Sequence, residues 1–385
     1  MQQTSSSVNP SLAGRAIPAW GRHRGRPGAR LAWIGQGFLL LLAAAVAYVL
    51  VTNFIKDPLL FAQFVLSGLQ LGFVYAMIAL GYTMVYGIVR LINFAHGDVF
   101  MVGAFVSFYA VTRFQLHVWP AAVFPGLSSG LVVVIGSLTV VLLSMVVCTA
   151  LAITIERVAY KPLRDAPRIA ALITAIGVSF FLEFFGALYF VFSPRFIPYQ
   201  RPFEVVTWYI KNGIHPMQAG QAPPEGSLTF SNIFLIIVAA SVLVQILLQF
   251  LVRRTKMGKA MRATSFDKPT ARLMGINVDG IISFTFAVGA AFAGLGGVLY
   301  AIAYSSIWTQ LGILPGLKAF VAAVLGGIGS IPGAFVGALI MGQAEALTMG
   351  YISTPMRDAV AFTILIVVLL VRPTGIFGEA AGEKA

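Results

Sequence analysis

The run RLINFAHGD at residues 90–98 is the densest group of polar side chains between two apolar stretches of this sequence. Asn93, His96 and Asp98 could contact a polar solute, and Gly97 could end or bend a helix beside them. Polar side chains inside a membrane are costly, so they usually face a cavity or a partner helix. We therefore name these three residues as candidates for a solute pathway. The alternative is a tight cytoplasmic turn in which Asn93 and Asp98 cap the helix ends.

Two carboxylic acids, Glu183 and Glu345, also fall inside apolar stretches. A carboxylate at such a position is a candidate functional group by default. Glu345 follows a glycine-rich segment and has Gln343 nearby, so we predict that it belongs to the pathway. For Glu183 the sequence favours a position near the outer interface, from which the side chain reaches water.

Covalent or acid–base chemistry has no support in this sequence. No Ser-His-Asp arrangement and no pair of carboxylates suggests a catalytic site, and no histidine has metal-ligand spacing. The single cysteine, Cys148, lies in an apolar run, which excludes an intrachain disulfide and a cysteine-based metal cluster. We expect no enzyme, no metal site and no cofactor.

The composition indicates a membrane protein. Of the 385 residues, 58% are hydrophobic and 10% are charged, whereas a soluble domain has roughly a quarter charged residues. The net charge of +13 does not point to nucleic acid, because the basic residues lie in loops between apolar stretches. Enrichment of Lys and Arg in cytoplasmic loops explains that distribution better.

We predict an all-α integral membrane protein with about nine transmembrane helices, eight to ten being compatible with the pattern. The eighth apolar stretch contains GGIGSIPG at residues 326–333, which should break a helix at membrane depth. Such a break survives only where protein or a water-filled cavity satisfies the freed backbone groups. Gly329 and Gly333 are therefore further pathway candidates. The predicted spans are 33–54, 60–86, 99–113, 130–155, 169–192, 231–252, 281–304, 317–349 and 357–371.

Basic residues predict the orientation. Loops 156–168 and 253–280 are rich in Lys and Arg, and two spans separate them, so both should face the cytoplasm. Residues 193–230 should then face outward, while the side of the C-terminus stays open. The Arg-rich N-terminus could belong to a cleaved signal peptide, but no small-x-small cleavage site follows the first apolar run, which favours a retained span.

Residues 253–280, called the basic segment below, predict two short helices. Met257, Ala260, Met261 and Thr264 form one apolar stripe, and Asp267 can cap a second helix over Lys268–Met274. Short helices exposed to water are marginal alone, so we predict a docking element; the alternative is a loop that serves only as a topology signal. The segment lacks a phosphate-binding glycine motif, so ATP would be hydrolysed by a separate subunit. The candidate coupling residues are Lys259, Arg262, Asp267, Arg272 and Gly275.

Small residues recur every four positions in two places. Gly289, Ala293, Gly297 and Ala301 form one row, and a second row of glycines starts at Gly329. Such rows let helix backbones approach closely in lipid. We interpret the first row as helix packing and leave both packing and a pathway role open for the second.

Four long segments resemble the permease subunit of bacterial branched-chain amino acid ABC importers. They are residues 68–110, 155–164, 257–299 and 318–347, and the resemblance runs in order from about residue 60 to about 378. It implies a helical subunit of the bacterial inner membrane that pairs with a second, related permease subunit. It further implies two ATP-binding subunits on the cytoplasmic face and a periplasmic binding protein that delivers Leu, Ile or Val. The family's coupling loop corresponds to residues 262–276, and its Asn-Phe-Ala-His-Gly signature to residues 93–97.

The resemblance leaves parts of the chain outside. We predict a polar tail plus an extra transmembrane helix over 1–58, the permease domain over 59–378 and a tail over 379–385. The signature continues here with Asp98 where the family often has Glu. Related permeases carry urea or short amides, which stays an alternative. A stand-alone secondary transporter or channel, and a membrane scaffold that transports nothing, are alternatives from other classes. Membrane lipid is an expected partner and nucleic acid is not.

Overall fold

The computed structural model describes residues 44–164, 166–217 and 221–378. The chain divides into two compact units, Met1–Lys56 and Asp57–Ala385. The described part of the first unit contains the apolar helix Ala44–Lys56. The beginning of the predicted span 33–54, like the N-terminal tail and the last seven residues, lies outside the described residues. Everything below concerns the second unit.

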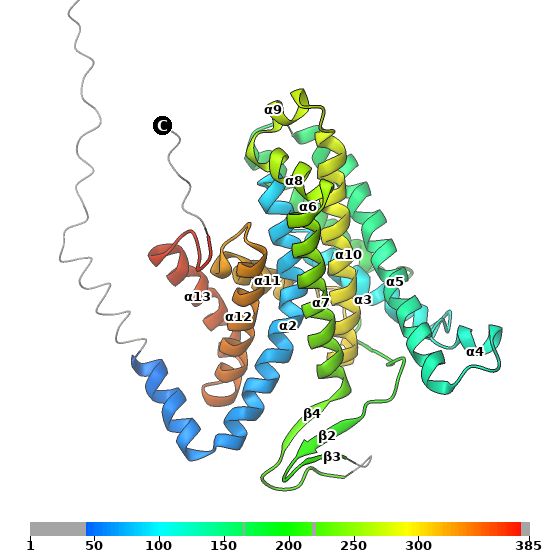
Figure 1. The fold of residues 1–385 in the computed structure, drawn as a ribbon, viewed down its shortest axis with the longest axis vertical. Helices are drawn as coiled ribbons and strands as arrows, with labels where there is room; N and C mark the ends of the chain where they lie inside the picture. Colours follow the sequence, from blue (N-terminus) through cyan, green and yellow to red (C-terminus); the bar gives the residue numbers. More distant parts are fainter. Residues whose placement is uncertain (1–43, 165, 218–220, 379–385) are drawn as a thin grey trace, which may run out of the picture. The chain divides into compact units, whose positions relative to one another are not determined.

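The second unit is built mainly from helices (Figure 1). A π-helical turn at Glu156–Tyr160 and a 3₁₀ turn at Lys161–Leu163 follow the helix α5. The α-helices are α2 (Pro58–Val89), α3 (His96–Thr112), α4 (Trp119–Val123), α5 (Ser129–Ile155), α6 (Arg168–Gly186), α7 (Asn232–Arg254), α8 (Lys256–Phe266), α9 (Lys268–Leu273), α10 (Val278–Tyr304), α11 (Ile313–Gly326), α12 (Ile331–Tyr351) and α13 (Met356–Val371).

The helical membrane class predicted from the sequence is confirmed. In the described residues six helices are long and apolar enough to cross a membrane: α2, α5, α6, α7, α10 and α12. The helix Ala44–Lys56 and the helices α3 and α11 are apolar but shorter. The count of about nine spans is therefore still a prediction.

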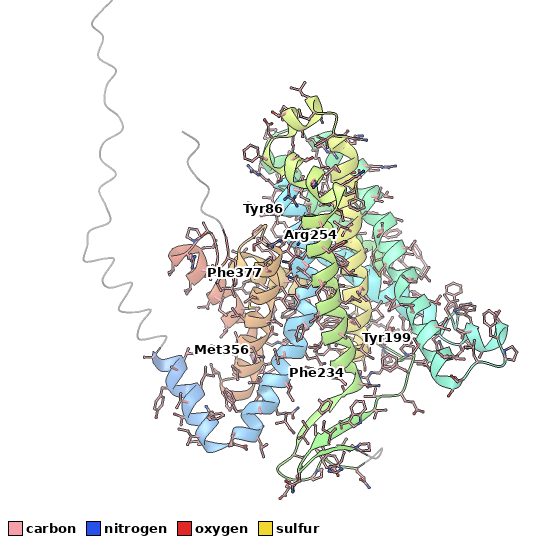
Figure 2. The ribbon with its side chains drawn as sticks, viewed as in Figure 1. Tyr86, Tyr199, Phe234, Arg254, Met356 and Phe377 are labelled. Carbon is pink, nitrogen blue, oxygen red and sulfur yellow. The ribbon has the colours of Figure 1, made fainter. Side chains whose placement is uncertain are left out.

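Helices α2 and α10 form the centre of the bundle. In the most apolar 18-residue stretch of each of these two helices, 67% of the residues are buried. The corresponding share is 22% in α5, α6 and α7, which lie at the periphery. Helix α2 packs against α10, α11, α12 and α7. Figure 2 shows that α7 runs from Phe234, near the strands, to Arg254, near α8 and α9. We call these two ends of the bundle the sheet end and the α8–α9 end.

A small antiparallel sheet lies in the segment that was predicted only as an outward loop. Its strands are β2 (Thr207–Ile210), β3 (Ile214–Pro216) and β4 (Leu228–Ser231), in the order β3-β2-β4, with Trp208 opposite Phe230. A second pair joins β1 (Ile197–Pro198) to β5 (Ser306–Ile307). The side chain of Gln63 on α2 binds both backbone groups of Thr229, accepting from N at 3.0 Å and donating to O at 3.1 Å. The outer edge of β4 is thereby occupied at this residue.

The predicted helix break is present. Helix α11 ends at Gly326, Gly327 and Gly329 have φ angles of 107° and 96°, and α12 starts after Ser330, whose hydroxyl accepts a hydrogen bond from Gly333 N. Positive φ angles of this size are readily adopted by glycine alone. The spacing of glycines therefore explains why one apolar stretch folds as a helical hairpin.

Helices α3 and α11 both begin inside the bundle. The backbones meet at Gly97, in the first turn of α3, and Gly312, the residue before α11. A Cβ on either residue would lie 2.4 Å from the carbonyl oxygen of the other. The side chain of His96 packs against Gly81 of α2. Gly81 lies eight residues before the end of α2 at Val89, which is about 12 Å along the helix axis. The polar run therefore lies in the interior, because α3 begins there at His96 rather than at the predicted residue 99.

Helix α5 is held on α3 and α10 by small polar side chains. The hydroxyl of Ser144 donates to Gly103 O at 2.9 Å and lies 3.3 Å from Gly294 O. One turn further, the buried Cys148 thiol donates to Val99 O at 3.3 Å. Such interhelical bonds to backbone carbonyls require close approach, which the small residues permit.

Glycines mediate close helix contacts, as predicted for the first row of small residues. Gly297 on α10 lies against the backbone of α3, where a Cβ would meet Phe100 O at 2.3 Å. Gly342 on α12 faces α2, where a Cβ would lie 2.3 Å from Gly72 N and 2.5 Å from Gly68 O. Neither site has room for a methyl group without movement of backbone.

We expect Gly342→Ala to destabilise the protein, because the new methyl group must push α12 away from α2, at a cost of about 1–3 kcal/mol. Gly177→Ala on α6 is the matched control, since a Cβ there meets nothing within 4 Å. Removing a glycine from an exposed helix should raise stability by about 0.5–1 kcal/mol. Thermal unfolding of both variants in detergent measures the difference. Equal unfolding temperatures would contradict the close packing of α2 and α12.

Candidate functional site

The polar run is buried where α3 starts. Asn93 is 5% exposed, and its side-chain oxygen accepts a hydrogen bond from the Tyr160 hydroxyl at 2.7 Å. Tyr160 belongs to the π-helical turn after α5, so this bond ties the beginning of α3 to a loop of the α8–α9 end. The chain does turn here, since His96 N donates to Asn93 O at 3.1 Å, but no side chain caps the start of α3.

The His96 ring is enclosed by α2. It is 2% exposed, lies edge-on to Tyr82 with ring centroids 4.8 Å apart, and rests on Gly81, where a Cβ would collide with Nε2. The Nε2 atom has no hydrogen-bond partner among the described residues. A histidine in this position can bind a solute only if the surrounding helices separate.

Asp98 is 1% exposed in the first turn of α3 and accepts a hydrogen bond from the Ser179 hydroxyl of α6 at 2.5 Å. Glu183, one turn beyond Ser179, is 5% exposed, and its carboxyl group lies close enough to that of Asp98 to interact with it. The prediction that the Glu183 side chain reaches water is therefore wrong, because that side chain is buried. Its hydrophobic neighbours in sequence conceal the partner, which comes from another helix.

Glu345 lies in a separate group, which we call the ion cluster: Lys318, Glu345, Arg357 and Asp358. The ammonium of Lys318 on α11 lies 2.6 Å from Glu345 Oε1 and 2.6 Å from Asp358 Oδ1. The Nε of Arg357 lies 3.8 Å and 3.5 Å from the same two oxygens. Helix α2 adds the Tyr75 hydroxyl, which donates to Glu345 Oε2 at 2.8 Å. Two positive and two negative charges therefore balance where α11, α12 and α13 meet.

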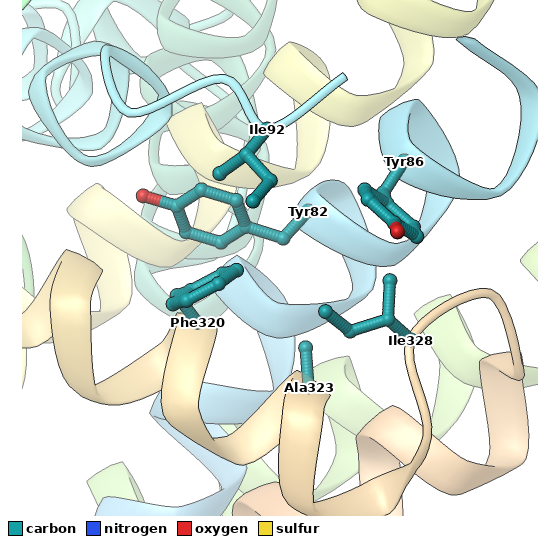
Figure 3. Close-up of a pocket in the computed structure, with 6 residues that line it drawn as sticks. All are labelled: Tyr82, Tyr86, Ile92, Phe320, Ala323 and Ile328. Carbon is teal, nitrogen blue, oxygen red and sulfur yellow. The ribbon is translucent and has the colours of Figure 1, made fainter. Parts of the chain in front are cut away.

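A small cavity lies between the helix break and the polar run (Figure 3). Its volume is about 10 Å³, close to that of a single water probe, so it is closed to an amino acid in this structure. Tyr82, Phe320 and Ile328 contribute from α2, α11 and the glycine-rich segment, and Gly329 lies nearby against Gly87. The full lining is Tyr82, Tyr86, Ile92, Phe320, Ala323 and Ile328.

The basic segment folds as the two predicted helices, α8 and α9. Asp267 caps α9, accepting from Thr270 N at 3.5 Å and from the Thr270 hydroxyl at 2.5 Å, and Gly275 follows with a φ of 80°. In the predicted stripe, Met261 and Thr264 are buried while Met257 is 39% exposed. The start and stop residues were thus the reliable signal, and the stripe was partly right.

Ion pairs join the basic segment to the loop after α5. Asp279 lies 2.6 Å from Arg164, 3.4 Å from Lys161 and 3.3 Å from Arg272. Arg164 also binds the fully buried Glu156, whose second oxygen accepts from the Ser283 hydroxyl at 2.7 Å. Because Arg272 of α9 pairs with Asp279, a displacement of α9 would act on the start of α10 and on the loop after α5. Lys259 and Arg262 are exposed on α8, and the Arg262 guanidinium binds Val252 O.

Apolar side chains are exposed at the tip of the basic segment. Leu273 is 87% exposed and Met274 is 78% exposed, beside Phe266 at 72%. They lie at the end of the bundle opposite the sheet (Figure 1). These large apolar side chains form an exposed apolar patch on an otherwise polar segment.

Asn93, His96 and Asp98 are all buried at the start of α3, but each contacts a different element. The sequence did not reveal these partners or most of the ion cluster. Lys318 and Tyr160 stand alone in their local sequence, and their partners lie 27 and 67 residues away. The one available signal was Lys318 itself, a charged residue in an apolar stretch. In the described residues no group of three or more His, Cys, Asp or Glu side chains is arranged to hold a metal ion.

We expect Lys318→Met to lower the stability by about 3–5 kcal/mol, because it leaves buried carboxylates with one cation. The double variant Lys318→Met/Glu345→Gln removes one charge of each sign and keeps an oxygen for Tyr75, so it should recover much of that loss. Thermal unfolding in detergent tests both variants. A double variant that loses as much stability as the single variants Lys318→Met and Glu345→Gln together would show that the two residues are not paired.

The family model for the branched-chain amino acid transport system permease component matches residues 64–369. The high-affinity branched-chain amino acid transport system permease protein LivH of Escherichia coli K12 is 40% identical over 85% of this chain and 98% of its own length. BraD of Pseudomonas aeruginosa is 40% identical over 84% of this chain and 98% of its own length.

A solved structure, PsaBC from Streptococcus pneumoniae in complex with Fab, matches at 14% identity over 84% of this chain and 96% of that chain. Its TM-score of 0.38 is too low to bear on the fold. The family match extends from α2 to α13. The six long apolar helices of the described residues, together with this match, indicate a protein that crosses the membrane several times. The chain belongs to the family of branched-chain amino acid transport system permease components.

Proposed function

We propose that this chain is the membrane-spanning permease subunit of an ABC importer for Leu, Ile and Val. The observation that carries the proposal is the 40% identity to LivH and BraD over 98% of their length. Because the similarity covers nearly the full length of both relatives, this chain has a counterpart for each of their domains. The chain itself provides helices for passage through the membrane rather than groups for catalysis.

The assembly would place this chain in the bacterial inner membrane with three kinds of partner. A second, related permease subunit completes the translocation pathway, and two ATP-binding subunits dock at the α8–α9 end. A periplasmic binding protein delivers the amino acid at the sheet end. The exposed Leu273 and Met274 support the docking of ATP-binding subunits at the α8–α9 end, since such residues are stabilised by burial against a partner.

The coupling mechanism follows from the connections of α8 and α9. ATP binding in the partner subunits moves these helices, and the motion passes directly into α7 and α10, which flank them in the chain. The Asp279–Arg164 pair carries it further to the loop after α5. The coupling residues of this proposal are Lys259, Arg262, Asp267, Arg272 and Gly275. Asp267 and Gly275 fix the two ends of α9, so we expect this helix to move as one rigid unit.

The pathway would open beside the closed cavity of Figure 3. Asn93, His96 and Asp98 lie at the start of α3, and Gly329 lies in the turn between α11 and α12. Gly333 packs against Gly326 in the first turn of α12, so both glycines belong to the part of the hairpin that would move. Separation of α11 from α2 would widen the cavity between Tyr82 and Phe320. Glu345 is a further pathway residue in this proposal. It lies nearer the sheet end, beside Arg357, whose side chain is 41% exposed.

Reconstitution tests this function. The chain, its companion permease and the two ATP-binding subunits are placed in liposomes with ATP inside and the binding protein outside. We expect uptake of labelled Leu, Ile and Val that stops when any subunit is left out. Uptake of urea or a short amide in place of Leu would overturn the substrate assignment. Uptake by the chain alone without ATP would identify a secondary transporter or channel and overturn the whole proposal.

We expect the double variant Leu273→Glu/Met274→Glu to lower uptake at least about tenfold. Two apolar side chains contribute on the order of 1.5–3 kcal/mol each when buried at an interface, and about 1.4 kcal/mol corresponds to tenfold in affinity. The purified variant should unfold at the wild-type temperature, since both side chains are exposed in the chain alone.

The control is Ile214→Glu, which likewise replaces an exposed apolar side chain with a glutamate, but at the sheet end. Copurification of the ATP-binding subunits should be reduced in the double variant and unchanged in the control. Normal copurification of both variants would remove the assigned role of α9.

A further inference from the structure

Helix α6 has a narrow polar face on an otherwise apolar surface. Phe180, Phe181 and Phe184 are 55%, 61% and 66% exposed, as expected of a helix that faces lipid. Ser179 and Glu183, one helical turn apart, point instead toward α3, and Glu183 is 5% exposed. Because so little of α6 is buried, its attachment to the bundle depends strongly on this face.

On α3, Asp98 meets this face with both oxygens buried. Oδ2 accepts from the Ser179 hydroxyl at 2.5 Å, whereas Oδ1 has no donor among the described residues. The Glu183 carboxyl group lies within hydrogen-bonding reach of Asp98. Two ionised carboxylates offer four acceptors and no donor, so they cannot form a hydrogen bond with each other.

No cation compensates the two acids. In the described residues the ion pairs of Lys318 and Arg164 are made with other carboxylates, and none joins Asp98 or Glu183 to a basic side chain. Besides Glu183, the titratable groups of other elements that interact with Asp98 are the hydroxyls of Tyr82 and Tyr160. Two buried negative charges at this distance would repel each other strongly, since a low dielectric does not screen them.

We propose that Asp98 and Glu183 bind a single proton between them, and that this shared proton holds α6 on α3. The proton makes one carboxyl group a donor to the other and reduces the charge of the pair from −2 to −1. The remaining negative charge lies in the first turn of α3, where the helix dipole favours an anion. A metal ion fits less well, because two carboxylates and one hydroxyl fall short of the six or more oxygen ligands that Ca²⁺ and Mg²⁺ take.

Infrared difference spectroscopy of the purified chain in lipid nanodiscs tests the proposal. At neutral pH the wild-type protein should show the carbonyl band of a protonated carboxyl group. Asp98→Asn and Glu183→Gln should each abolish that band, because an amide then donates to the remaining ionised carboxylate. Glu204→Gln, at an exposed position, is the control and should leave the band unchanged. A wild-type spectrum without the band overturns the proposal.

Unfolding temperatures separate the shared proton from a plain packing contact. Glu183→Ala removes the partner of Asp98 and should be destabilised, while Glu183→Gln should keep close to wild-type stability. Equal loss of stability in both variants would overturn the role of the proton in holding α6. A missing band combined with stabilisation by added Na⁺ or Ca²⁺ would replace the proton with a bound cation. The measurements need no transport partner, so their outcome is independent of the proposed function.

Discussion

The contact between Gly97 and Gly312 is the constraint on which the interior of the bundle depends. Helices α3 and α11 both start there, at a level where α2 and α10 pass through without interruption. A chain that interrupts a helix inside an apolar bundle must satisfy the freed backbone groups with protein. Only residues without side chains let two helix starts come this close, so each shields the backbone of the other.

Buried charge is distributed around this contact in two groups with different electrical character. The ion cluster contains equal numbers of cations and anions and joins three helices and Tyr75 of α2. In the described residues no basic side chain forms an ion pair with Asp98 or Glu183, and the Ser179 hydroxyl donates to Asp98. Removing one partner from the balanced cluster would leave an uncompensated buried charge, which is strongly destabilising.

Local signals predicted part of this structure well. Asp267 and Gly275 set the ends of α9, and the glycines of 326–333 broke one apolar stretch into α11 and α12, because capping and positive φ angles act within a few residues. The depth of the polar run, the burial of Glu183 and the ion cluster depend on residues far along the chain. Hydropathy and periodicity report how apolar a segment is, but do not report which helix it meets. The small sheet before α7 escaped notice because its strands are only three or four residues long.

The thiol of Cys148 on α5 has a practical consequence. It is the single sulfhydryl of the sequence, it is fully enclosed, and it is engaged with Val99 O. Since a shielded thiol reacts slowly with maleimides, the native protein is already a low-background host for fluorophores or spin labels. Cysteines placed on α9 and on the surface of α6 could then report their distance during turnover without any prior removal of native residues.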